Sequence, residues 1–235
     1  LAIRFADLPG EIRALARQCI LDTLGTALAG ADDELVRILA AELAEQGGNP
    51  VCGVIGSTLR LPALSAALLN GTAAHALDYD DVNLAMPGHP TVAVLPAVLA
   101  LAEERGAGGE ALLAAFVAGY ETACRVGLLV APGHYDTLGF HATGTVGSFG
   151  AAAACAHLLG LSESQTVHAL GIAATQAAGL KSMFGTMCKP LHAGRAAYNG
   201  LLAARLAARG FTARSDSLEC AQGFAAAYST DFHPE

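Results

Sequence analysis

The chain has 235 residues and is 53% hydrophobic, 14% charged and 6% aromatic, with a formal net charge of −8. This composition excludes intrinsic disorder, which requires low hydrophobicity and high charge. The acidic balance also argues against nucleic acid as a partner, because that would need a basic surface. Since soluble domains usually carry about 25% charged residues, we expect another subunit or domain to cover part of the surface.

Cysteine usage and the apolar segments predict a cytoplasmic protein with no membrane partner. The six cysteines form no CxxC pair and are expected to be buried or inert thiols: Cys19, Cys52, Cys124, Cys155, Cys188 and Cys220. The first residues do not resemble a signal peptide, and a start at Leu1 rather than Met suggests a trimmed or partial chain. The most apolar stretch, residues 146–161, contains Ser148 and His157. It is shorter than the ~18–20 clean apolar residues of a membrane span, so we interpret it as a core helix.

Segments rich in Ala and Leu with helical spacing dominate the chain, which predicts an all-α domain. In chain order we expect helices at residues 8–30, 32–45, 61–77, 90–104, 109–129, 143–159, from 162 onward, and 190–209. Residues 51–55 are expected to form a short strand or an extended connector. A proline in the first turn suits the first and last of these helices, and a capping box at Ser162 to Gln165 begins the seventh.

Glycines recur at every third residue of the predicted helix 143–159, at Gly144, Gly147 and Gly150. Each costs up to about 1 kcal/mol in a helix interior, so their presence needs a reason. We favour the close approach of neighbouring buried helices. The alternative is a substrate that lies against the glycine face.

A first polar cluster follows the predicted helix 61–77 and contains His75, Asp78, Asp80 and Asp81, with His89 in the next loop. If the helix continues through the cluster, His75, Asp78 and Asp81 share one face at i, i+3 spacing. The alternative is a solvated helix end, although acids at a helix C-terminus oppose the macrodipole.

Two further clusters precede later helices. In one, His141 comes directly before the glycine-rich helix, where Thr143 can cap the first turn. In the other, Lys189 precedes a helix with His192 in its first turn and Arg195 one turn further along. Taken singly, His141 is an ordinary loop histidine and Lys189 an ordinary surface lysine.

The three clusters share one feature, because His89, His141 and Lys189 each lie just before or within the first turn of a predicted helix. Helix N-termini offer unpaired N–H groups and a positive dipole end, so they hold carboxylates well. If these ends converge, they form a pocket for a small polyanion, with a histidine as acid or base and Asp78 as its partner. The convergence is a hypothesis that spacing alone does not establish.

Two other kinds of site are disfavoured. Residues 78–81 also match the DxDD pattern of terpene cyclases, but so few aromatic residues and no Trp are poorly suited to a carbocation. A metal held by His75 and Asp78 is disfavoured because no third ligand has a useful spacing. We therefore expect no metal and no cofactor.

The segments AHALDYDDV, GHP, GFHATGTVGSFGAAAA and FGTMCKPLHAGRAA, in this order, resemble the MmgE/PrpD family of 2-methylcitrate dehydratase-like proteins. That family also includes cis-aconitate decarboxylase and iminodisuccinate epimerase. FADLPGEIRALARQCILDTLGTALAG and GFTARSDSLECAQGFAAAYS fit as well, so the likeness covers nearly the whole chain. It implies a large all-helical domain over residues 1–235, a homodimer, and chemistry without an iron–sulfur cluster. It also implies a smaller α+β lid domain after residue 235, which is expected to be absent from this chain.

The resemblance carries the family's functional residues onto this sequence. By motif match, the implied catalytic residues are Asp78, His89, His141 and Lys189. The expected substrate-binding residues are His75, Thr143, His192 and Arg195. Val82 stands where decarboxylase-type members often have a polar residue, which weakens that assignment.

The main functional hypothesis is a hydro-lyase of the 2-methylcitrate dehydratase type that acts on a small hydroxy di- or tricarboxylate. His141 or His89 would remove a proton α to a carboxylate and protonate the leaving hydroxyl. Lys189 would bind a carboxylate or the developing enolate charge, and Asp78 would orient a histidine or act as a second acid or base. The alternatives are a cis-aconitate decarboxylase-like or iminodisuccinate epimerase-like activity, and a non-catalytic helical dimer that lacks the lid.

Overall fold

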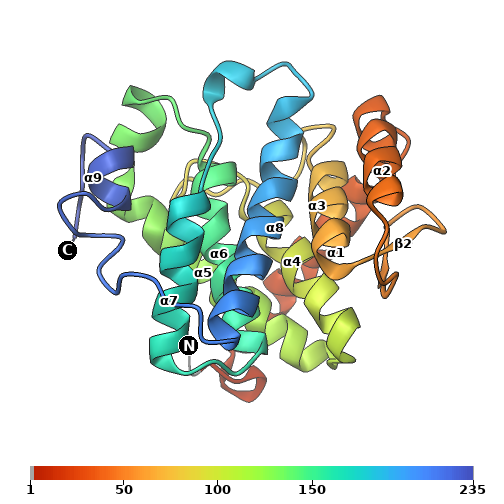
Figure 1. The fold of residues 1–235 in the computed structure, drawn as a ribbon, viewed down its shortest axis with the longest axis horizontal. Helices are drawn as coiled ribbons and strands as arrows, with labels where there is room; N and C mark the ends of the chain where they lie inside the picture. Colours follow the sequence, from red (N-terminus) through yellow and green to blue (C-terminus); the bar gives the residue numbers. More distant parts are fainter. Residues whose placement is uncertain (1–2, 235) are drawn as a thin grey trace.

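The computed structural model describes residues 3–234 and is helical apart from one pair of very short strands (Figure 1). The elements are η1 (Phe5–Asp7), α1 (Gly10–Gly30), α2 (Glu34–Gln46), β1 (Cys52–Gly53), β2 (Arg60–Leu61), α3 (Ala63–Ala74), α4 (Pro90–Arg105), α5 (Gly109–Val130), η2 (Gly133–Thr137), α6 (Ala142–Leu158), α7 (Glu163–Gln176), η3 (Lys181–Met183), α8 (Cys188–Ala208) and α9 (Phe224–Tyr228). β1 and β2 pair antiparallel. The predicted all-α class is confirmed.

Helix α6 forms the centre of the domain, and every residue from 142 to 156 is buried. It packs against α4, α5, α7 and α8, which surround it (Figure 1). A Cβ on Gly147 would lie 2.6 Å from the Cβ of Ala93 in α4, and one on Gly150 would lie 2.8 Å from the Cβ of Ala123 in α5. Such distances are far below ordinary contact, so the glycines confirm the predicted close approach of helices. These contacts bring the starts of α4 and α6 close together.

The helix predicted for residues 61–77 is shorter than expected, and it does not continue through the acidic cluster. Helix α3 ends at Ala74, and His75 follows it with a φ of −100°. Asp78 has a φ of 58°, in the left-handed region that an α-helix cannot accommodate but that Asp tolerates better than most residues. His75, Asp78 and Asp81 therefore do not share a helix face, because the chain turns at Asp78.

Other boundaries differ by a few residues. Pro9 is the N-cap of α1 rather than part of its first turn. Helix α8 begins at Cys188, two residues earlier than expected, which places Lys189 inside its first turn. The capping box at Ser162 and Gln165 is confirmed and starts α7.

Burial separates the six free cysteines into three groups. Cys52, Cys124 and Cys155 are buried, Cys19 and Cys220 are half-buried, and Cys188 is exposed. The expected burial is therefore confirmed for the first three. Cys188 is exposed, so for this thiol the alternative part of the expectation, that it is inert, stays a prediction.

Within the described residues, α5 has the length and hydropathy of a membrane span, and 61% of its most apolar stretch is buried inside the domain. It packs along α6 as a core helix. The apolar stretch 146–161 is also a core helix over most of its length, as predicted, because it forms most of α6.

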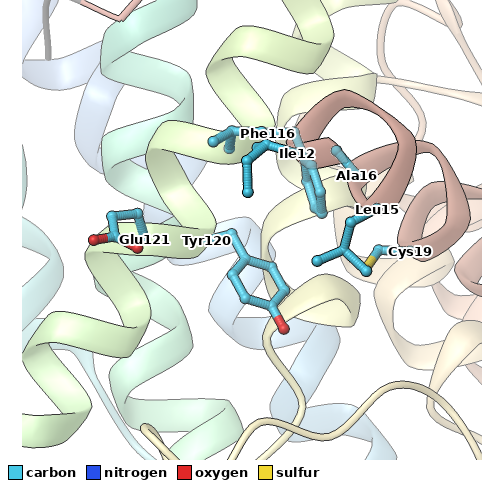
Figure 2. A pocket seen from close by; sticks show the side chains of 8 residues that line it. Ile12, Leu15, Ala16, Cys19, Phe116, Tyr120 and Glu121 are labelled. Carbon is cyan, nitrogen blue, oxygen red and sulfur yellow. The ribbon is translucent and has the colours of Figure 1, made fainter. Parts of the chain in front are cut away.

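An apolar cavity of about 210 Å³ lies between α1 and α5 (Figure 2). It is lined by Ile12, Leu15, Ala16, Cys19, Phe116, Val117, Tyr120 and Glu121. Glu121 is the one charged group among these side chains, and it is an anion. This cavity is therefore unsuited to a carboxylate ligand.

Candidate active site

The starts of α4, α6 and α8 meet at a second cavity of about 290 Å³. His89 is the N-cap of α4, His141 is the N-cap of α6, and Lys189 is the second residue of α8. The residues that line the cavity are Asp78, Pro87, Gly88, His89, Tyr135, His141, Phe184 and Lys189. The structure thus brings together the helix starts whose convergence spacing could not establish, and with them all four implied catalytic residues.

Asp78 and Lys189 form an ion pair at this cavity. The Lys189 ammonium bonds to Asp78 Oδ1, and His89 Nε2 lies 3.7 Å from the same oxygen. The side chain of Lys189 is only 11% exposed, whereas that of Asp78 is 54% exposed. The ammonium also lies 5.1 Å from the ring centre of Phe184. The Lys189 ammonium is therefore fixed in the cavity wall by Asp78 and Phe184, unlike the side chain of an ordinary surface lysine.

Behind the cavity wall, the carboxylate of Asp80 lies between two histidines and its side chain is fully buried. His75 Nδ1 lies 2.9 Å from Oδ1 and 3.1 Å from Oδ2. His89 Nδ1 lies 3.0 Å from Oδ2, an ion-pair distance without the alignment of a hydrogen bond. Burial by itself raises the pKa of Asp80, but the hydrogen bond from His75 and the contact with His89 outweigh it and hold this pKa below its usual range.

The same carboxylate affects the charge of His89. Burial lowers the pKa of His89, but the nearby Asp80 carboxylate outweighs burial, so the net pKa is raised. His89 is therefore predisposed to carry a proton near neutral pH. The cavity wall then combines the carboxylate of Asp78 with Lys189 and His89, and the buried carboxylate of Asp80 lies behind it.

His141 has the opposite protonation preference and is only 2% exposed. Burial, with the nearby His75, His192 and Lys189, lowers the pKa of His141 to about 2. Its Nδ1 lies 3.0 Å from His192 Nδ1, so one ring donates to the other, and its ring meets Phe184 edge-on at 4.9 Å. The environment therefore favours the protonated form of the His89 imidazole and the neutral form of the His141 imidazole, and this difference can separate an acid from a base.

Two expected substrate-binding residues, His75 and Thr143, lie behind the cavity wall. Both are completely buried, and neither lines the cavity. The Thr143 hydroxyl accepts a hydrogen bond of 3.1 Å from the backbone N–H of His89. Thr143 thus holds the loop that carries His89 and does not act as the side-chain cap of α6.

The other two expected substrate-binding residues also lie outside the cavity wall. His192 is half-buried and contacts His141. Arg195 is exposed, and its guanidinium lies 4.6 Å from the ring centre of Tyr198 on the same helix. The structure therefore does not bring Arg195 to the implied catalytic residues.

The acids of the DxDD pattern face different partners. Asp78 pairs with Lys189, Asp80 with His75 and His89, and Asp81 accepts hydrogen bonds from the hydroxyl (2.6 Å) and backbone N–H (3.3 Å) of Thr91. Asp81 thereby holds the first turn of α4. The three carboxylates do not form one acidic cluster, so the terpene cyclase alternative gains no support.

The residues that could hold a metal ion are His75, Asp78, Asp80 and His89, whose ligand atoms lie within 4.8 Å of one another. This corrects the expectation that His75 and Asp78 have no third ligand nearby, because the turn at Asp78 brings Asp80 and His89 to them. However, the Lys189 ammonium already bonds to Asp78, and His75 is bonded to Asp80. Asp78 is thus already paired with a protein cation, and Asp80 already accepts a hydrogen bond from His75.

Sequence reasoning did not assign a role to Tyr135 or Asp80. Tyr135 lies in η2 and lines the cavity, and burial raises the pKa of its phenol. Lys181 Nζ donates to the Tyr135 carbonyl (3.1 Å) and lies 3.7 Å from its ring centre. No sequence pattern marks Tyr135. Asp80 stands in the acidic motif, but its contacts depend on the turn at Asp78, which the sequence did not predict.

We expect the free energy of unfolding to fall as the pH is lowered from 7.5 to 5.5. Burial is the main cause that lowers the pKa of His134, His141 and His192. These side chains are neutral when folded and take up protons when unfolded below about pH 6.5, so the unfolded chain binds more protons. His89, whose pKa is raised, opposes this trend, because its contribution is present at low pH and is lost as the pH rises through its folded pKa.

Urea unfolding at the two pH values checks this expectation. Three histidines have a lowered pKa and one has a raised pKa. The free energy of unfolding should therefore fall, on balance, by an amount on the order of 1 kcal/mol. An unfolding free energy that stays constant or increases at pH 5.5 would contradict the assigned neutral state of these histidines.

An all-helical domain is the architecture that the resemblance implied, and the comparisons agree on the family. Residues 1–235 match the model of the MmgE/PrpD N-terminal domain, so the chain belongs to the MmgE/PrpD family. It is 34% identical over 232 residues to the cis-aconitate decarboxylase of Homo sapiens, covering 97% of this chain and 48% of that protein.

Two fungal proteins are similar to the same extent. The cis-aconitate decarboxylase of Aspergillus terreus is 36% identical over 228 residues, covering 92% of this chain and 46% of that protein. A cis-aconitate decarboxylase-like protein of Aspergillus oryzae is 35% identical over 214 residues, with 88% and 44% covered. The chain thus spans less than half the length of these curated relatives.

Proposed function

We propose that the protein is a lyase that releases CO₂ from a small unsaturated tricarboxylate of the cis-aconitate type. The observation that supports it best is the cavity where Lys189, a protonated His89 and a neutral His141 meet at three helix starts. The relatives named cis-aconitate decarboxylases suggest the substrate class. They favour this reaction over the 2-methylcitrate dehydration that was the main expectation from the sequence.

The cavity suits carboxylate groups for two reasons. Helix N-termini bind anions through free N–H groups and the helix dipole, and three helices begin here. Lys189 adds a fixed positive charge, whose value increases where water is excluded. Asp78 partly offsets this charge, so the substrate would compete with Asp78 for the ammonium.

Decarboxylation places specific demands on these groups. The C–C bond to one carboxylate breaks, CO₂ leaves, and the electron pair stays on carbon, conjugated with the double bond and a remaining carboxylate. Lys189 would stabilise this negative charge, and Nε2 of protonated His89 would deliver the proton that completes the product. His89, whose side chain is 15% exposed, would regain its proton from solvent. Neutral His141 would hold a second carboxylate by hydrogen bonding.

Dehydration of a hydroxy tricarboxylate is the second candidate. Val82 favours it, because decarboxylase-type members often have a polar residue at this position. In this reaction neutral His141 would accept the proton α to a carboxylate, and His89 would protonate the departing hydroxyl. Both reactions use the same charged and neutral histidines. They differ in the bond that breaks, which an assay can detect directly.

The test uses the complete protein that carries residues 1–235, because the curated relatives are about twice as long. Purified protein is incubated separately with cis-aconitate, citrate and 2-methylcitrate, and both CO₂ and the organic products are measured. CO₂ release from cis-aconitate supports the proposal, whereas water loss without CO₂ supports the dehydratase. A folded protein that neither turns over nor binds these acids would support the non-catalytic alternative and contradict both reactions.

A further inference from the structure

Asp80 is not a group that substrate can reach. Its side chain is fully buried, and it does not line the cavity. Its carboxylate instead lies between His75, at the end of α3, and His89, at the start of α4. Asp80 therefore joins two helix ends that are separated by the turn at Asp78.

The chemistry of a carboxylate determines how the two rings must face it. An ionised carboxylate only accepts hydrogen bonds, so His75 Nδ1 must carry the proton that it shares with Asp80. His89 Nδ1 lies 3.0 Å from the same carboxylate without hydrogen-bond alignment, and the negative charge there favours a proton on this nitrogen. This leaves Nε2 of His89 on the side of Asp78, whose Oδ1 lies 3.7 Å away in the cavity wall. The ring is thus oriented with one nitrogen to the interior and the other to the reaction site.

We infer that Asp80 is a positioning residue, whose buried carboxylate fixes the ring orientation and tautomer of His89 so that Nε2 faces the substrate. Asp78 was expected to orient a histidine, but its half-exposed carboxylate is paired with Lys189. An aspartate behind a catalytic histidine performs the same task in serine hydrolases. The catalytic consequence rests on the proposed function, whereas the ring geometry can be measured without turnover.

The substitution Asp80→Asn tests this inference because it changes one atom. An amide is uncharged and replaces one acceptor oxygen by an NH₂ donor, so it removes the anion near both Nδ1 atoms and disfavours a proton on the Nδ1 that its NH₂ group faces. We expect kcat of the complete protein to fall about 30-fold, as for other residues that orient a reacting group. Circular dichroism and thermal unfolding confirm that the variant folds.

Asp81→Asn is the matched control. Asp81 adjoins Asp80 in the same loop, and its replacement removes the same charge, but its carboxylate bonds to Thr91 and not to a histidine. We expect this variant to keep kcat within about 5-fold of the parent, because the amide oxygen can still accept from Thr91. Equal losses in the two variants would contradict a specific role for Asp80.

The pH profile separates positioning from general destabilisation. The titratable groups around His89 are Asp78, Asp80 and Asp81 in the loop, His75 after α3, His141 before α6 and Lys189 in α8. Loss of the Asp80 anion makes protonated His89 less stable, so the basic limb of kcat/KM should move to lower pH. The shift should be larger in Asp80→Asn than in Asp81→Asn. An unchanged limb in Asp80→Asn would overturn the inference.

Nitrogen-15 spectra of histidine-labelled protein provide a readout that needs no activity. In the parent protein, Nδ1 of His89 should stay protonated from pH 6 to pH 8, and Asp80→Asn should yield a mixture of tautomers. If no substrate is turned over, the proposed function fails but these spectra still decide the role of Asp80. A parent protein whose neutral His89 carries its proton on Nε2 would overturn the inference even if the variant did not fold.

Discussion

Replacing Lys189 by Met should lower kcat/KM of the complete protein by about 10³-fold, the scale seen when a preorganised charge-stabilising group is removed. Met keeps most of the length of the side chain but removes the charge. The ammonium is largely shielded from water and lies at the start of α8, where a carboxylate or a developing negative charge would be placed. Steady-state kinetics on cis-aconitate would measure the loss.

Lys181→Met is the matched control for this experiment. Lys181 lies close by in η3, but it bonds to the Tyr135 carbonyl and does not line the cavity. Its replacement should change kcat/KM by less than about 5-fold, since it removes one hydrogen bond to a backbone carbonyl and no group that lines the cavity. Near-normal activity in Lys189→Met would exclude Lys189 as the stabilising cation.

Replacing His141 by Ala should cost at least about 10²-fold in kcat/KM, because an imidazole that exchanges or holds a proton contributes 10²–10⁴-fold. His141 is neutral because its pKa is lowered to about 2. The pH profile of kcat/KM in the variant should therefore keep the limbs of the parent profile, since His141 does not titrate between about pH 5 and pH 9. A limb that disappears in the variant would show that the charge states of His141 and His89 are exchanged.

The comparison for His141 is His192→Ala, which removes the partner of His141 but leaves the cavity lining intact. We expect a loss of about 10-fold, from looser placement of the His141 ring. A loss in His192→Ala as large as in His141→Ala would mean that His192 itself meets the substrate. Full activity in His141→Ala would end the assignment of His141.

The positions of helices could be predicted from the sequence where a few neighbouring residues determine them. The glycine spacing of α6 and the capping box of α7 are properties of a few neighbouring residues, and the structure has both. The end of α3 did not follow, because the helical pattern continues to residue 77. What stops the helix is the backbone turn at Asp78 and the pairing of His75 with Asp80.

The site was predictable in its components but not in its arrangement. His89, His141 and Lys189 share a position relative to a helix start, and this local feature marked all three. Their meeting depends on how closely α4, α6 and α8 pack, which spacing along the chain does not encode. Arg195 shows the opposite case. Its position one turn further along the Lys189 helix suggested a substrate-binding residue, but its side chain lies over Tyr198 and not at the cavity.

The small side chains of α6 limit how this domain can change over evolution. A helix surrounded by close neighbours cannot enlarge its residues without displacing the helix starts that carry His89 and Lys189. The connecting segments at residues 76–88 and 131–141 and around η3 are less constrained, and they contribute most of the side chains that line the cavity. The central helix thus fixes where the neighbouring helices begin, while the loops at one end of it can change length and sequence without disturbing that packing.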